Sequence, residues 1–407
     1  MSSPGSAFAA RPLSCSVTDP PWRMWMAAWI VTAVFVLSNS ATPLYVRWQD
    51  AIGFSSATLT AIFASYILGL LLTLLVAGQL SDRYGRRPVL IPGLAAAIVA
   101  CLLFAGAHSV PMLIAARFLS GVAVGVVVSA GMAAVVDLGG PDRKRQAALV
   151  ASIAMVLGAG LGPLIAGSLA LAMERPVVPT FAVELVVLLT ALVAVLILPL
   201  KHRGARTDAG WHPHLPAVPR ANHRHLHLGI AVFGPGITAT SFVLALGPSL
   251  LSRLLGVTSP LIAGGMACAM FLTATGVQFA ARQLSVRTIF LCGATATILS
   301  MGGITLAVAS SNAAVLIVAA LLAGSGQGLG QLGGLTLIGL HVPGNHRAEA
   351  NAVLNIGGYV PAGLMPVGTG IAIDQAGLSL GATLFAAALA CIAGLGGLTV
   401  IRNLGTD

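Results

Sequence analysis

The sequence predicts an all-α integral membrane protein whose twelve transmembrane helices form two six-helix bundles. Hydrophobic residues make up 57% of the chain and charged residues only 8%, and the mean hydropathy is +0.95. A soluble domain carries about 25% charged residues. Apolar runs of roughly 20 residues recur along the chain, which is the length that a helix needs to cross a ~30 Å hydrocarbon core. The shorter alternating segments of a membrane β-barrel are absent from the sequence.

The apolar runs define the domain organisation. Residues 1–23 form a polar N-terminal tail and not a signal peptide, because the first apolar run is too long and lacks a clear cleavage site. A polar linker over 201–227 separates a bundle over 24–200 from a bundle over 228–401, and 402–407 form a C-terminal tail. The predicted spans are 24–46, 57–80, 88–107, 111–134, 147–172, 177–200, 228–252, 258–281, 288–310, 313–340, 349–373 and 378–401.

The distribution of basic residues predicts the orientation of the helices. With the N-terminus inside, seventeen Lys and Arg residues fall in inner loops and tails, three in outer loops, and one, Arg117, within a span. This excess follows the positive-inside rule, places both termini in the cytoplasm and fits a bacterial inner membrane. The formal net charge of +10 therefore reports orientation in the bilayer, and we expect no binding to nucleic acid.

The loop between the second and third spans concentrates charge in a chain that has little. One carboxylate and three guanidiniums occur within six residues, so ion pairs are expected there. Gly85 can supply a turn with positive φ, and Pro88 can open the next helix. A short basic loop that only anchors orientation is the simpler interpretation.

This loop resembles the loop between helices 2 and 3 of the major facilitator superfamily, whose pattern is G-x-L-x-D-R-x-G-R-R/K-x-x-L. The matching residues are Gly78, Leu80, Asp82, Arg83, Gly85, Arg86, Arg87 and Leu90. The resemblance implies a transporter that works by alternating access. Asp137, at the inner end of the fourth span, can pair with the loop arginines. We hypothesise that these charges form a lock that holds the cytoplasmic side closed.

Charged residues inside the spans are candidates for proton coupling. An arginine near a helix centre costs about 2.5–3.5 kcal/mol on insertion scales, so Arg117 is either functional or snorkels to the outer surface. Arg117 and Gly121 match the R-x-x-x-G pattern of helix 4 in the same superfamily, which implies proton coupling. Glu184 is the only acidic residue well inside a span. It can carry a proton, or it can form a structural ion pair with Arg117 at similar depth.

The fifth span carries a glycine and proline pattern. Gly158, Gly162, Pro163 and Gly167 match the G-x-x-x-G-P-x-x-G-G pattern of the drug:proton antiporter branch, although Ala166 replaces one glycine. The resemblance implies export in place of import. Close helix packing alone also explains small residues at these positions.

Polar side chains within the spans are candidates for a substrate cavity. The cluster around Asn39 in the first span favours either a cavity face or a proline kink with satisfied hydroxyls. Tyr66 is a plausible cavity residue. In the second half, which repeats the first at an offset near 203, two pairs of amides lie one turn apart and either bind substrate or join helices. These amides are Gln327, Gln331, Asn351 and Asn355.

Several short motifs could indicate a nucleotide or metal site, but the sequence around them does not fit those functions. Residues 328–333 satisfy G-x-G-x-x-G, but they lie in a membrane-length apolar run and not in a βαβ unit. The five cysteines show no metal or disulfide spacing, and the histidines of the linker lack partner ligands, so no cofactor or metal is expected. We therefore expect no enzyme.

The sequence thus predicts a secondary transporter that couples protons to efflux of a drug or metabolite, and the resemblance to the family implies a monomer. Without an ATP site, uphill transport must use an ion gradient. The alternatives are a proton-linked importer and a membrane sensor that keeps the fold. The predicted cavity fits lipophilic or cationic drugs, but also sugars or amino acids.

Overall fold

The computed structural model describes residues 20–140, 143–200, 218–343 and 346–404, and every regular element in these ranges is helical. Twelve helical segments are long and apolar enough to cross a membrane, which confirms the predicted number of spans. In the first half the elements are α1 (Pro21–Ser40), η1 (Thr42–Leu44), α2 (Tyr45–Ile52), α3 (Ser56–Tyr84), α4 (Arg86–Ala105), α5 (Val110–Val126), η2 (Val127–Gly131), α6 (Met132–Gly139), α7 (Lys144–Ala172) and α8 (Val177–Ile197). In the second half they are η4 (Arg220–Asn222), α9 (His223–Ser249), η5 (Leu250–Leu254), α10 (Pro260–Ala281), α11 (Val286–Ser310), α12 (Ala313–His341), α13 (Arg347–Ala376) and α14 (Leu378–Asn403).

Local sequence explains where several helices begin and bend. The Ser55 side chain accepts a hydrogen bond from the Thr58 amide at the start of α3, and Ser285 does the same for α11. Gly85 has φ +93° and joins α3 to α4, as the sequence predicts. The first span is longer than expected, because a 3₁₀ turn at Pro43 continues α1 into α2 and extends the span to Ile52. The fourth span contains a π-helical turn, η2, that nothing in the sequence indicated.

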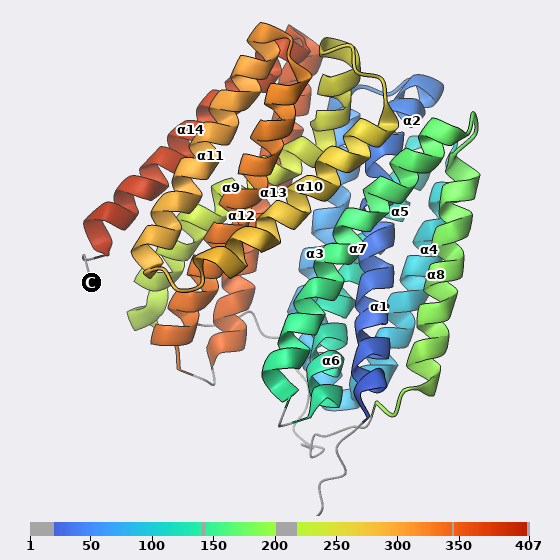
Figure 1. Cartoon of the computed structure of the whole chain (residues 1–407), viewed down its shortest axis with the longest axis vertical. Helices are drawn as coiled ribbons and strands as arrows, with labels where there is room; N and C mark the ends of the chain where they lie inside the picture. The colour runs from blue at the N-terminus through green and yellow to red at the C-terminus, as the bar shows by residue number, and fades with distance from the viewer. Residues whose placement is uncertain (1–19, 141–142, 201–217, 344–345, 405–407) are drawn as a thin grey trace, which may run out of the picture.

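The two halves form two bundles (Figure 1). In the first, α3 packs on α5, α1 on α7 and α4 on α8; in the second, α12 packs on α9 and α11, and α11 on α14. The internal repeat is visible in how the helices approach. A Cβ added at Gly121 would meet the backbone of α3, and one added at Gly324 would meet the equivalent backbone of α10. Small residues therefore serve the same close contact in both halves.

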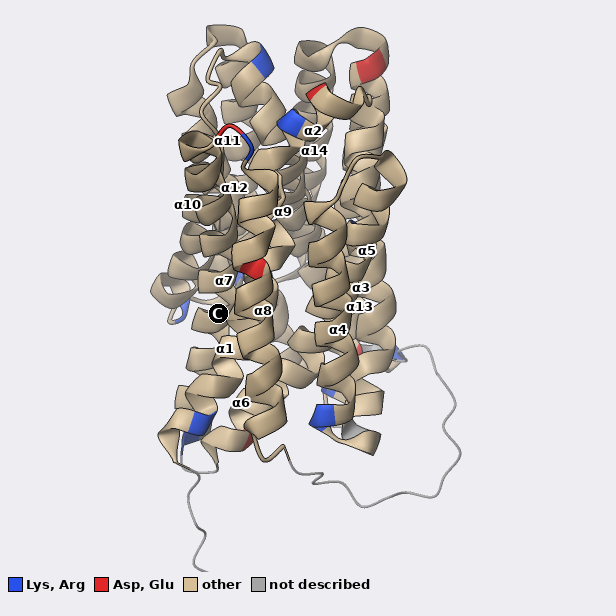
Figure 2. Cartoon of the chain, turned by 90° about the vertical axis from the view of Figure 1, so that its right-hand side faces the viewer, with Lys and Arg blue, Asp and Glu red and all other residues tan. Residues whose placement is uncertain are grey.

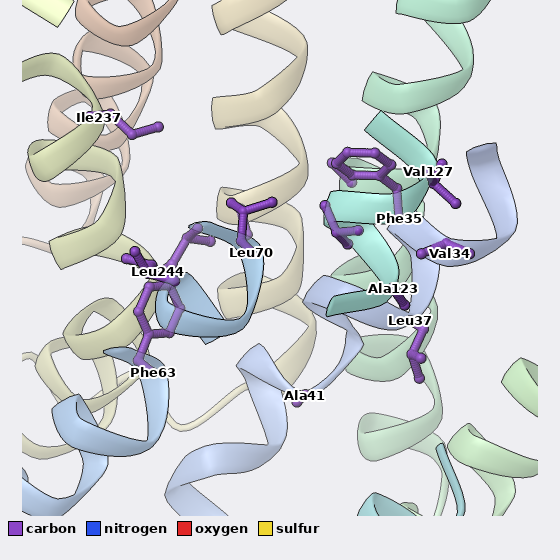
Figure 3. Packing of buried hydrophobic residues seen from close by; sticks show 14 of the residues in the cluster. Val34, Phe35, Leu37, Ala41, Phe63, Leu70, Ala123, Val127, Ile237 and Leu244 are labelled. Atoms are coloured by element: carbon purple, nitrogen blue, oxygen red, sulfur yellow. The ribbon is translucent and has the colours of Figure 1, made fainter. Parts of the chain in front are cut away.

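Contacts between the halves gather at one end of the molecule, which we name the Asp50 end. There α3 crosses α13, and α7 crosses α10. The opposite end, which carries Arg86, Arg143 and Arg347, is named the Arg86 end. Figure 2 shows the charged residues concentrated toward the two ends, with few between them. Buried apolar residues from both halves pack between these ends, including Phe63 of α3 and Leu244 of α9 (Figure 3).

Candidate functional site

A central cavity of about 300 Å³ lies between the halves. Helices α1, α3, α5, α7, α9, α10, α12 and α13 all contribute to its wall. Its lining reaches from Phe63 near the Asp50 end to Leu335 nearer the Arg86 end. Of the substrate residues proposed from the sequence, Asn39, Tyr66, Gln327, Gln331 and Asn355 are part of the lining. Asn351 is not, and its buried Oδ1 has no hydrogen-bond partner.

The wall formed by the second half is rich in amides. Gln278 Nε2 donates to Gln331 Oε1 at 3.4 Å, which joins α10 to α12. Gln327 Oε1 is buried and has no partner. Gln278 and Thr275 line the cavity but were not predicted to do so. Their spacing in the sequence could have predicted this, since residues three positions apart lie on the same face of a helix.

Arg117 is buried in the wall at the Asp50 side of the cavity. Its side chain is almost wholly enclosed, with 1% of the residue exposed. Nη1 donates to the Ser38 carbonyl oxygen at 2.5 Å, and Nε donates to the Tyr45 hydroxyl. The guanidinium also lies 5.3 Å from the Phe63 ring centroid and 5.8 Å from that of Tyr66. Nη2 is buried and has no hydrogen-bond partner. Because the whole side chain is enclosed, Arg117 does not snorkel to the membrane surface.

Glu184 of α8 is fully buried and lies outside the cavity lining. Its Oε1 accepts a hydrogen bond from Ser40 Oγ at 2.6 Å, while Oε2 has no partner. The suggested ion pair between Glu184 and Arg117 is therefore not formed. The reason is that each side chain finds its own partner on α1, the carboxylate at Ser40 and the guanidinium at Ser38.

Three consecutive residues at the end of α1 bring these groups together. Ser38 holds Arg117 through its carbonyl oxygen, Asn39 lines the cavity, and Ser40 holds Glu184. The Asn39 side chain also donates to Ser38 Oγ at 2.9 Å. Both interpretations of this polar cluster are thus partly met. Asn39 lines the cavity, and the Ser38 hydroxyl donates to the Phe35 carbonyl oxygen of α1. Ser40 Oγ shares its one hydrogen between the Val36 carbonyl oxygen, at 2.7 Å, and Glu184 Oε1. The Glu184 carboxylate and the cavity therefore contact the same turn of α1, at Ser40 and Asn39, respectively.

The charged loop lies at the Arg86 end. Arg86 Nε contacts Asp137 Oδ2 at 3.2 Å, an ion pair that joins α4 to α6 within the first half. Arg86 Nη1 also donates to Ser81 Oγ, and Arg87 Nη2 donates to the Leu196 carbonyl oxygen at 2.9 Å. Arg83 lies over the ring of Tyr84. A Cβ on Gly78 would meet nothing within 4 Å. The side chain of Asp82 lies outside the described part of the structure.

The fifth-span glycines divide between two tasks. A Cβ on Gly158 would lie 2.7 Å from the Phe35 side chain of α1, and one on Gly162 would strike the α1 backbone at Val36. These two glycines pack the first half together. Gly167 faces the other half, where a Cβ would lie 2.6 Å from the Pro260 carbonyl oxygen, and Pro163 is in contact with Gly264 of α10.

Two polar contacts hold the halves together at the Asp50 end, and the sequence did not predict either. Arg253 Nη2 contacts Asp50 Oδ1 at 3.0 Å. Asp374 of α13 accepts hydrogen bonds from the Ser56 and Ala57 amides, at 2.9 and 3.0 Å, and so caps α3. The repeat offset offered a signal for the first contact, because Asp50 and Arg253 are separated by that offset and meet across the pseudo-symmetry.

Two related helical halves around a cavity, with twelve segments long and apolar enough to cross a membrane, have the architecture of a multi-pass transporter. The chain matches the family model described as Major Facilitator Superfamily over residues 24–366. The protein therefore belongs to that superfamily, whose fold and activity are those of transporters and not of enzymes.

Partial relatives agree with this membership, and a solved structure agrees with the fold. The chain is 33% identical to the multidrug resistance protein MdtL of Klebsiella pneumoniae over 145 residues, covering 33% of this chain and 36% of the relative. It is 36% identical to MdtL of Escherichia coli over 119 residues, covering 27% and 29%, respectively. The chain thus spans about a third of the length of these relatives. A POT family transporter in complex with 5-aminolevulinic acid superposes with a TM-score of 0.76 at 12% identity, covering 94% of this chain and 96% of the other.

Proposed function

We propose that this transporter exports a small molecule from a bacterial cell in exchange for protons across the inner membrane. The observation that carries this proposal is the arrangement at residues 38–40 of α1. A buried carboxylate, Glu184, and the substrate cavity are joined there through three consecutive residues. A buried carboxylate with one unpartnered oxygen is stabilised by taking up a proton, so Glu184 is suited to carry the coupling proton.

The direction of transport rests on two observations. The fifth-span pattern resembles that of drug:proton antiporters, and the partial relatives include proteins named for multidrug resistance. A proton-linked importer or a non-transporting sensor lacks comparable support. We further propose that the Arg86 end faces the cytoplasm, because the excess of Lys and Arg lies there. The protein is then inward-facing in this structure, since its halves meet at the Asp50 end.

The charged loop would act in the opposite state. When the halves close at the Arg86 end, Asp82, Arg83 and Arg86 come within reach of the second half, and Asp137 orients Arg86 for that contact. Arg117 of α5 bonds to Ser38 of α1, two residues from the Ser40 that holds Glu184, and we assign it to proton coupling with Glu184. We expect a monomer, because each chain contains a complete cavity.

The test is accumulation of a compound panel in a bacterial host that lacks its own efflux pumps. Wild type is compared with Glu184→Gln and Asp82→Asn, each with and without a protonophore, at matched protein levels. Lower accumulation that both the protonophore and Glu184→Gln abolish supports proton-coupled export. Higher accumulation would mean import. Full uphill export by Glu184→Gln would remove Glu184 from coupling, and wild-type rates in Asp82→Asn would refute the lock.

A further inference from the structure

The charges around the cavity bear on which molecules it accepts. Arg117 is the one charged side chain among the described residues of the lining. No described carboxylate pairs with it, because its partners are a backbone carbonyl, a hydroxyl and aromatic rings. None of the described acidic residues forms an ion pair with Arg117. Glu184 is fully buried behind α1, and Asp50, Asp137 and Asp374 lie at the two ends.

The guanidinium is also incomplete as a hydrogen-bond donor. Nη2 is buried, belongs to a residue that lines the cavity, and has no partner. A buried donor without a partner is costly, and an acceptor oxygen on a bound molecule relieves that cost. A cationic group in the same place would meet an uncompensated positive charge at low dielectric, where repulsion is strong.

The opposite wall supplies neutral polar groups. Gln278 and Gln331 are bonded to each other, which leaves the Gln278 oxygen and the Gln331 amide hydrogens available. Gln327 Oε1 is also unpartnered. The lining also includes apolar side chains, among them Phe63, Leu70 and Leu244 (Figure 3). A ligand therefore meets one cationic donor, apolar side chains and neutral polar groups.

We infer that the cavity selects amphipathic molecules that either carry a negative charge or present a neutral acceptor oxygen to Arg117, and that it rejects lipophilic cations. This inference rests on the proposed function, since it assigns the substrate class to the cavity of the exporter. It narrows the range that the sequence left open, which included lipophilic and cationic drugs, sugars and amino acids.

The test uses three probes of similar shape and different charge: triphenylphosphine oxide (neutral, with an acceptor oxygen), tetraphenylborate (anionic) and tetraphenylphosphonium (cationic). Binding to the purified full-length protein in lipid nanodiscs is measured by equilibrium dialysis, with empty nanodiscs subtracted. We expect saturable, mutually competitive binding of the oxide and the borate, and at least tenfold weaker binding of the phosphonium.

Two variants connect the preference to this site. Gln331→Glu adds a carboxylate to the amide wall at nearly constant shape, so we expect phosphonium binding to tighten about tenfold and borate binding to weaken. Arg117→Gln should reduce the preference for borate over phosphonium. Wild-type protein that binds the phosphonium as tightly as the borate, or that binds none of the three saturably, overturns the inference.

This assay also separates the inference from the proposed function. Binding is measured at equilibrium without a proton gradient, so failure of proton-coupled export leaves the predicted charge preference in place. Conversely, an exporter that binds the phosphonium best would retain the proposed function and lose the inferred substrate class.

Discussion

A methyl group placed at Gly370 should force the halves apart at the Asp50 end. A Cβ on Gly370 of α13 would lie 2.7 Å from the Ser56 carbonyl oxygen and 2.8 Å from Ala57 Cα, both backbone atoms of α3. Ordinary contact begins at 3.4 Å, so the helices must separate by about 0.7 Å (3.4 − 2.7). Overpacking of this kind costs roughly 1–3 kcal/mol. Only the conformation in which α3 and α13 touch bears this cost.

The expected result of Gly370→Ala is therefore a shift in conformational equilibrium. At 1.4 kcal/mol for each factor of ten, the ratio of inward-facing to outward-facing molecules should fall about 5- to 150-fold. The assay is double electron–electron resonance between spin labels at Gln146 and Leu340, exposed positions near the Arg86 ends of α7 and α12, in a cysteine-free background. The population at short distances should increase.

Gly368 provides the matched control. It lies two residues away on the same helix, and a Cβ there would meet nothing within 4 Å. Gly368→Ala has the same effect on helix propensity and on the unfolded chain, so it should leave the distance distribution unchanged. Identical distributions for Gly370→Ala and wild type, with both proteins folded, would refute the argument that backbone contact at Gly370 sets the closed outer end.

Three further predictions concern single polar groups. Asp374→Asn weakens an exposed cap of α3 by under about 1 kcal/mol, so the same spin-label distances should shift toward the outward-facing state by up to about fivefold; no shift would mean that the cap is energetically neutral. Glu184→Gln removes a buried ionisable group but keeps an acceptor for Ser40, so the melting temperature should not fall. Substrate exchange without a proton gradient should persist, while uphill transport should be lost. Loss of both exchange and uphill transport would point to misfolding. Tyr45→Phe leaves the Nε of Arg117 without its acceptor at a cost of about 1–3 kcal/mol, which a melting curve should register as a lower melting temperature; an unchanged curve would contradict the assigned bond.

The fold class was available from the sequence because a bilayer imposes simple rules. Every backbone polar group must be satisfied within its own helix, and every span must match the thickness of the hydrocarbon core, so run length alone located the twelve helices. Errors occurred at the ends of spans: the first span continues to Ile52, past its predicted end, whereas α8 ends at Ile197, before the predicted residue 200. The turn at Gly85 follows from local sequence. The pairing of Arg86 with Asp137 was accessible for another reason, because both residues lie at the same end of their spans.

Tertiary structure decided which polar groups share a cavity. Approximate depth along a span is readable from sequence, and Arg117 and Glu184 bond to residues two positions apart on α1. The direction in which each side chain points depends on how α8 and α5 are rotated against α1, and that rotation sends Glu184 to Ser40 and Arg117 to Ser38 in place of one another. The contact of Asp374 with α3 likewise depends on how the two halves meet at the Asp50 end. Ser56 and Ala57, whose amides donate to Asp374, lie more than 300 positions away in the chain. Sequence by itself therefore determined what crosses the membrane, and packing between helices decided where charge and cavity meet.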